Sequence, residues 1–179
     1  MKKILYFLLI PLFAFSTAGC REEPIISHDQ EILFQMDYVN YAWGFQHYGF
    51  MIDNLGRILT YDNPDKWNFP DNNFILTEDQ VDQNISMCRI SGEKISREEL
   101  GKFSSYIDKI SSSKITAMRN TGADAGTLQY ICFSYSENSH MYKGVLVKSE
   151  GDFSAENLNF HSKKVVAWMR SIEESIASR

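Results

Sequence analysis

The segment FMIDNLGRILTY, residues 50–61, has the pattern of two β-strands joined by a tight turn. Two apolar runs flank the sequence DNLG, residues 53–56, in which asparagine and glycine tolerate the positive φ angles that hairpin turns require. We therefore expect strands at 48–52 and 57–61. This hairpin decides the fold class, because a tight turn makes its two strands antiparallel neighbours in a sheet.

Further strands are predicted on both sides of this hairpin. Residues 37–46 alternate loosely between apolar and polar side chains and indicate a third antiparallel strand, with Gly44 and Gly49 at a bend or bulge. The apolar runs 127–135 and 141–149 flank a short polar segment and predict a second hairpin.

The remaining apolar residues recur at helical spacing. Thr77 and Gln80 form a capping box before a helix over 78–88, and Ser96 begins a second helix through Ile110. A third helix is expected from its N-cap Ser154 to Ile176. Its buried side is marked by Leu158, Val165, Met169, Ile172 and Ile176. The sequence predicts an α+β fold, an antiparallel sheet built from two hairpin regions with helices packed on one face.

The first nineteen residues have the layout of a secretory signal peptide. Lys2 and Lys3 precede an apolar run over 4–15, which is too short for a membrane-spanning helix of about 20 residues. Small residues follow this run. We expect residues 1–19 to be removed, residues 20–30 to form a lipidated cysteine and tether, and residues 31–179 to form a single α+β domain.

The sequence TAGC, residues 17–20, resembles the lipobox of bacterial lipoproteins, although the family most often has leucine at the position of Thr17. The resemblance implies that Cys20 becomes the first mature residue and carries acyl chains such as palmitate, which anchor the protein in the membrane. The following REE, residues 21–23, resembles the export signal of surface lipoproteins of the Bacteroidetes. It implies an outer-membrane lipoprotein exposed at the cell surface, the alternative being an anchor facing the periplasm.

Charge excludes one class of partner. The full chain has 18 basic and 23 acidic side chains, a formal net charge of −5, and loss of Lys2 and Lys3 with the signal peptide leaves −7. Nucleic-acid binding requires clustered basic residues, so no nucleic acid is expected as a partner. The sequence also contains no metal-ligand spacing and no cofactor motif, so neither a metal nor a cofactor is expected.

Two cysteines remain in the expected mature domain. Cys88 and Cys132 form a possible disulfide, because an exported protein meets an oxidising environment. We favour two buried free thiols instead, because Cys132 lies within an apolar strand pattern.

Five residues are candidates for ligand binding. The loop at 62–74 contains Asp62 and Asp65, whose oxygens suit a cation, and Trp67 and Phe69, whose rings suit a sugar or a peptide. Asp, Asn and Pro also stabilise long turns by local hydrogen bonds, which is the alternative interpretation. Trp43 lies in the aromatic-rich segment before this loop.

Three functions from different classes fit the sequence. The favoured one is a lipid-anchored, non-enzymatic binding module for a protein or glycan, with no catalytic residue. An inhibitor or immunity-type lipoprotein that neutralises a protein partner is the first alternative. The second is a hydrolase with a site around His47, which precedes the carboxylate of Asp53, or around His161 in the last helix.

Overall fold

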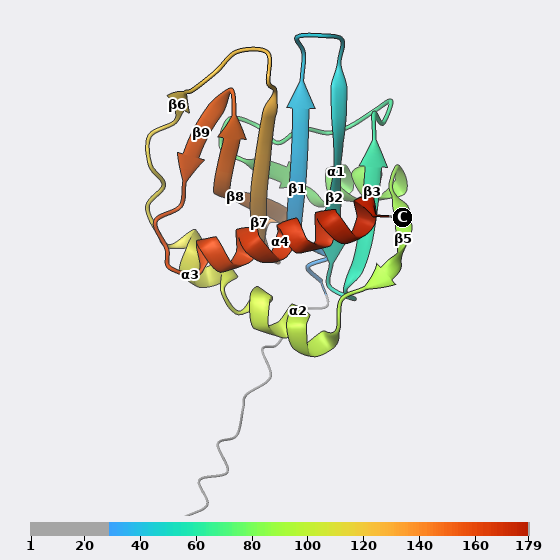
Figure 1. Cartoon of the computed structure of the whole chain (residues 1–179). Coiled ribbons are helices and arrows are strands. Elements are labelled where there is room, and N and C mark those ends of the chain that lie inside the picture. The colour runs from blue at the N-terminus through green and yellow to red at the C-terminus, as the bar shows by residue number, and fades with distance from the viewer. Residues whose placement is uncertain (1–28, 179) are drawn as a thin grey trace, which may run out of the picture.

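The computed structural model describes residues 29–178, so the expected signal peptide, Cys20 and most of the tether lie outside the described residues. The described part contains a nine-stranded sheet in the order β5-β3-β2-β1-β7-β8-β9-β6, with β4 paired to β8 (Figure 1). The strands are β1 Ile32–Asn40, β2 Gln46–Asp53, β3 Arg57–Asp62, β4 Ile75–Thr77, β5 Arg89–Lys94, β6 Arg119–Asn120, β7 Thr127–Ser136, β8 Met141–Gly151 and β9 Phe153–Glu156. The α+β class and the antiparallel sheet are confirmed, since every pairing between these strands is antiparallel.

The hairpin at 50–61 forms β2 and β3, and its turn is held by Asp53. The buried Asp53 carboxylate accepts hydrogen bonds from the backbone N–H groups of Leu55 and Arg57 and also contacts the Arg57 guanidinium. Gly56 has a φ of +77°, which glycine adopts without steric cost. Asp53 therefore fixes a turn and does not hydrogen-bond to His47.

Strand β1 lies at the centre of the sheet, paired with β2 on one side and β7 on the other. It begins five residues earlier than the strand expected at 37–46 and ends at Asn40, before a turn in which Gly44 has a φ of +98°. The expectation of a bend or bulge at Gly49 is wrong, because Gly49 pairs in regular register with Asp37 and Tyr61.

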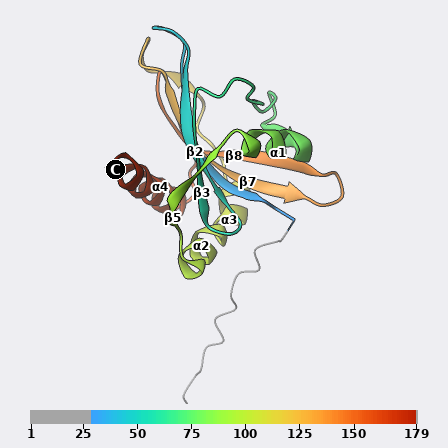
Figure 2. The same ribbon diagram turned by 90° about the vertical axis from the view of Figure 1, so that its right-hand side faces the viewer.

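Helices lie on both faces of the sheet (Figure 2). They are α1 Glu78–Ser86, α2 Arg97–Ser104, α3 Ile107–Ser111 and α4 Ser162–Ala177. The expected packing of helices on one face is not confirmed. Helices α2, α3 and α4 pack against one cluster of strand residues, whereas Val81 and Ile85 of α1 pack against the other. The physical reason is that central strands such as β2 alternate apolar side chains to both faces, so both faces need cover.

We name the two faces of the sheet by the elements that pack against them. The helical face is the one against which α2, α3 and α4 pack, and it carries Phe34, Ile52 and Tyr130. The open face carries Met51, Leu59, Tyr61 and Ile131 and is covered by α1, β4 and the loop between β3 and β4. These are two separate buried clusters divided by the sheet.

The last helix begins later than expected. Ser154 lies in β9 and not at a helix N-cap, and Leu158, expected to be buried, is 64% exposed. The chain pairs with β8 through Glu156, and the buried Asn157 then donates its side-chain N–H to the carbonyl of Ile110. These tertiary contacts hold the chain extended before α4, so the helical spacing of Leu158 is accidental. From Val165 onward the expected buried side of the helix is confirmed for Val165, Met169 and Ile172.

Candidate functional site

Two polar side chains lie inside the apolar strand β1. Gln35 and Asp37 alternate with Phe34 and Met36, so they point to the open face while their neighbours point to the helical face. Asp37 is 7% exposed and Gln35 is equally well buried. Buried polar groups need hydrogen-bond partners, and here the partners are each other and side chains of β2 and β3.

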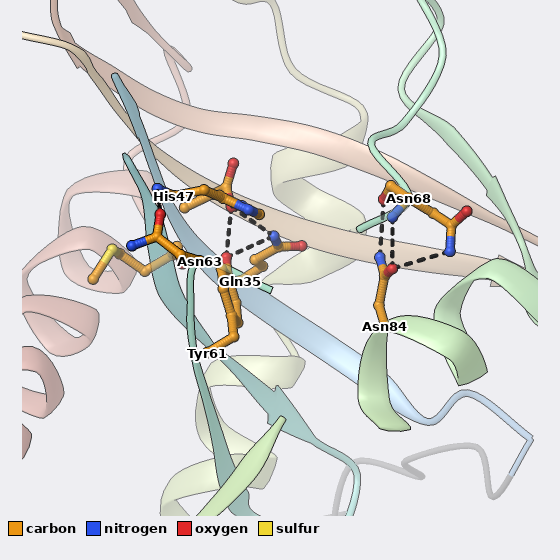
Figure 3. A network of polar contacts seen from close by, with 8 residues as sticks. Gln35, His47, Tyr61, Asn63, Asn68 and Asn84 are labelled. Atoms are coloured by element: carbon orange, nitrogen blue, oxygen red, sulfur yellow. Dashed lines mark hydrogen bonds and ion pairs between the residues drawn. The ribbon is translucent and has the colours of Figure 1, made fainter. Parts of the chain in front are cut away.

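A hydrogen-bond network converges on one oxygen of Asp37. The His47 Nε2 donates to Asp37 Oδ1 at 2.8 Å, and the Tyr61 hydroxyl donates to the same oxygen at 2.5 Å. The Gln35 amide Nε2 lies 3.2 Å from Asp37 Oδ1 and 3.0 Å from the Tyr61 oxygen (Figure 3). Three donors, one each from β1, β2 and β3, therefore hold the carboxylate in one orientation.

Gly49 makes this network possible. Tyr61 lies on β3, and its ring must cross β2 for the hydroxyl to reach Asp37 on β1. A Cβ atom on Gly49 would lie 2.6 Å from the Tyr61 hydroxyl oxygen and 2.0 Å from the Met36 carbonyl oxygen. Glycine is therefore required by the close approach of both the Met36 carbonyl and the Tyr61 ring.

The network keeps Tyr61 in its protonated form. Burial, and next the negative charge of Asp37, raise the pKa of Tyr61 well above its usual value of 10.0. A neutral phenol donates a hydrogen bond, whereas a phenolate would repel the carboxylate. Tyr61 is therefore a permanent donor to Asp37 at physiological pH.

Aromatic rings enclose His47, which is fully buried. Phe69 and Trp67 of the loop after β3 lie with ring centroids 4.9 and 5.2 Å from the imidazole. The buried His47 Nδ1 has no hydrogen-bond partner among the described residues. Within the same part of the chain, no serine, threonine or cysteine side chain hydrogen-bonds to His47, so the hydrolase alternative has no nucleophile positioned beside it.

A pocket of about 740 Å³ opens above this network. Gln35 and Asp37 of β1 and Gln129 of β7 line it, together with loop residues 67–72 and with Phe153 of β9. Its volume is in the range typical of small-ligand sites. The network thus forms part of the pocket lining, with His47 behind Asp37.

The loop between β3 and β4 is fixed in place at the pocket. The backbone N–H of Asn68 donates to Asn84 Oδ1 at 2.8 Å, and Asn84 Nδ2 donates back to the Asn68 carbonyl at 2.9 Å (Figure 3). Asp71 accepts from the backbone N–H groups of Asn73 and Ile75, which lower its pKa. These contacts attach the loop to α1 and hold Trp67 and Phe69 over His47.

The structure brings together some of the predicted ligand-binding residues and separates others. Trp67 and Phe69 line the pocket, whereas Asp62 and Asp65 are solvent-exposed and do not. Trp43 is 79% exposed in the turn between β1 and β2, where the neighbouring Tyr41 lines the pocket and is 73% exposed. Trp43 therefore lies next to the pocket, on its rim.

The remaining candidates lie elsewhere. His161 stacks on Tyr106 with centroids 4.1 Å apart, and its pKa is lowered by burial and then by the charges of Lys109 and Lys164. Its buried Nδ1 has no partner among the described residues, so the second hydrolase candidate also has no positioned nucleophile.

Cys88 and Cys132 are free thiols. Cys88 packs on the open face and Cys132 on the helical face, so the sheet separates them. Burial raises the pKa of each thiol to about 12, which makes both unreactive at neutral pH.

Sequence reasoning missed Gln35 and Asp37. The available signal was their alternation, since two polar residues at positions i and i+2 inside an apolar strand share one face. Residues 37–46 were instead expected as the strand, which placed Gln35 outside it. The partner of His47 was sought in Asp53, which is nearer to it in the sequence than Asp37.

Comparison with protein-family models, with curated proteins and with solved structures finds no match to this chain. Among residues 29–178, no helix is long and apolar enough to cross a membrane. The same residues contain no group of three or more His, Cys, Asp or Glu side chains that could hold a metal ion.

Proposed function

We propose that this protein is a lipid-anchored binding module of the bacterial outer membrane, displayed at the cell surface through acyl chains on Cys20. The observation that carries the binding function is the pocket of about 740 Å³ on the open face, lined by aromatic rings and by the buried carboxylate of Asp37. A mostly apolar pocket with a few oriented polar groups is the usual form of a ligand site.

Occlusion of the pocket tests the binding function. Val39 lines the pocket two residues beyond Asp37 on β1, so Val39→Trp fills it from the floor. We expect one class of compound from a mixture of amines, amino-acid derivatives and neutral oligosaccharides to show saturation-transfer NMR signals with the full chain in neutral detergent. Val39→Trp abolishes these signals, whereas Ile90→Trp, at an exposed site on β5, leaves them unchanged. Binding that survives Val39→Trp, or no binding by any class, contradicts the proposal.

Metabolic labelling tests the anchor. Cells grown with an alkyne fatty acid are expected to label the wild-type chain and not Cys20→Ser, because the thioether to diacylglycerol requires the cysteine sulfur. Equal labelling of the variant would exclude Cys20 as the acylated residue. Digestion of intact cells by an added protease distinguishes surface display, in which the chain is cut, from a periplasm-facing anchor, in which it is protected.

The exposed aromatic turn favours a second candidate, an inhibitor or immunity-type lipoprotein with one tight protein partner. Tyr41 and Trp43 are exposed beside the pocket, and aromatic residues are enriched in protein interfaces. A complex that survives gel filtration and is lost in Trp43→Ala would support this candidate over a small-molecule receptor.

A further inference from the structure

The polar side chains on the pocket floor have unused hydrogen-bond acceptors. Gln35 directs its Nε2 toward Asp37 Oδ1 and the Tyr61 hydroxyl, so its Oε1 points away from them (Figure 3). All three donors to Asp37 use Oδ1. No described residue donates to Asp37 Oδ2 or Gln35 Oε1, and both side chains line the pocket. The floor therefore presents two acceptors to an occupant.

The electrostatic environment of these acceptors is negative. Asp71, Asp124 and Asp152 line the pocket with Asp37, and no lysine, arginine or histidine is among the described residues that line it. An anionic ligand would meet uncompensated repulsion in this partly buried site. A positive charge would instead compensate a carboxylate that the fold holds almost entirely out of water.

The pocket walls also suit a cation. Aromatic side chains contribute much of the lining: Tyr41, Trp67, Phe69, Phe74, Phe133 and Phe153. Ring faces attract guanidinium and ammonium groups, and the attraction is stronger where water is excluded. The same rings accommodate the aliphatic stem of an arginine or lysine side chain.

We propose that the pocket binds a guanidinium or ammonium group on an aliphatic stem, with Asp37 Oδ2 as its counter-ion and Gln35 Oε1 as a second acceptor. The proposal rests on the binding function proposed above and names the ligand class of that same pocket. Two sources present this chemistry, a free amine and a basic side chain of a protein partner. The exposed rings of Tyr41 and Trp43 at the pocket rim contact the protein partner and are out of reach of a free amine.

An uncharged isostere provides the direct test. Titration calorimetry of the full chain in neutral detergent compares Nα-acetyl-argininamide with Nα-acetyl-citrullinamide, which has the same shape without the charge. We expect the arginine derivative to bind about tenfold or more tightly, because charge-assisted hydrogen bonds are roughly twice as strong as neutral ones. Equal affinities, or tighter binding of the citrulline derivative, overturn the proposal.

Two variants locate the cation. Asp37→Asn retains an acceptor for the network but removes the charge, and it should lose the preference for argininamide. Gln129 lies directly opposite Asp37 on β7, so Gln129→Lys supplies an internal cation that competes with the ligand without altering the network. We expect about tenfold weaker binding in Gln129→Lys even if Asp37→Asn fails to fold. The exposed Asp62→Asn is the control and should change nothing. Unchanged argininamide affinity in Gln129→Lys excludes Asp37 as the counter-ion.

The two sources of the cation give different patterns. If the natural occupant is a protein side chain, acetyl-Ala-Arg-Ala-amide binds more tightly than 1,5-diaminopentane, and Trp43→Ala weakens only the peptide. If it is a free amine, the diamine binds at least as well and is insensitive to Trp43→Ala. Binding of maltotriose in preference to all cationic probes overturns the cationic ligand and leaves the pocket function intact. If no probe binds, both the cationic ligand and the binding function of the pocket are overturned.

Discussion

The two faces of the central sheet differ in how completely they are covered. Apolar and aromatic side chains dominate the centre of the helical face, and three helices cover them; Phe34 of the sheet and Ile110 and Met169 of the helices are fully buried. The open face is apolar where α1 and β4 cover it but carries Gln35, Asp37 and His47 under the loop after β3. The comparison indicates that stability comes mainly from the helical face, whereas the proposed ligand binding depends on the open face.

The largest expected effect tests the helical face. Met169→Ala removes a fully buried side chain of α4 and leaves a cavity, so the free energy of unfolding should fall by about 2–5 kcal/mol. Urea denaturation measures this change, and Ile90→Ala on exposed β5 is the control, with a change of about 0.5 kcal/mol or less. A loss below 1 kcal/mol for Met169→Ala would reverse the assignment of stability to this face.

Gly49→Ala tests how tightly the network is built. The added Cβ would overlap the Met36 carbonyl oxygen, a backbone atom that can move only with the strand. We expect a loss of about 1–3 kcal/mol in the free energy of unfolding, which is typical of overpacking. Tyr61→Phe combined with Gly49→Ala should restore little of this loss, because the backbone contact persists. Full restoration would show that only the tyrosine hydroxyl is crowded.

Tyr61→Phe tests the network itself and its dependence on pH. Loss of the hydroxyl leaves Asp37 with fewer donors and should cost about 1–3 kcal/mol at pH 7. The folded-state pKa of Tyr61 lies above its unfolded value near 10.0, so its stabilising effect is complete below pH 10 and is lost as pH rises beyond it.

Urea denaturation of both proteins from pH 8 to pH 11 measures this difference. The free energy of unfolding of the wild type should decline more steeply above pH 10 than that of Tyr61→Phe. Other tyrosines and the two thiols titrate in both proteins, so they cancel in the comparison. Parallel declines would mean that the pKa of Tyr61 is the same in the folded and the unfolded protein.

The smallest expected effect on stability is at the pocket rim. Trp43→Ala should change the free energy of unfolding by no more than about 0.5 kcal/mol, because its ring is mostly exposed. Thermal denaturation measures this change, and Trp168→Ala, which removes a buried ring from α4, is the contrasting variant. A marked destabilisation by Trp43→Ala would assign the exposed turn to the fold and not to recognition.

Local sequence signals predicted those elements whose conformation is fixed by neighbouring residues. The hairpin at 50–61 follows from its turn residues, and α1 begins directly after its N-cap Thr77, with both hydrogen bonds of the predicted capping box present. Prediction failed where contacts between residues distant in the sequence decide the conformation of a segment. Strand β9 forms at residues expected in a helix because β8 is available to pair with it.

The residues of the candidate site show the same difference between what local sequence predicts and what distant contacts decide. Trp67 and Phe69 were predicted because their rings suit a sugar or a peptide, and both line the pocket. Asp62 and Asp65 lie in the same predicted loop as these two rings, yet both are exposed to solvent. The alternation of Asp37 with apolar residues indicates only that it shares a face with Gln35, and its role depends on strands that bring His47 and Tyr61 beside it.

The sequence by itself determined the α+β class, the antiparallel character of the sheet and the acidic charge, because these depend on composition and on contacts between residues close in the chain. The expected lipid anchor also depends only on the sequence and remains a prediction. The tertiary structure alone decided that the sheet has an open face and that Asp37 lies at a pocket. Strand order and helix placement are set by contacts between distant residues, and those contacts determine which polar groups become buried together.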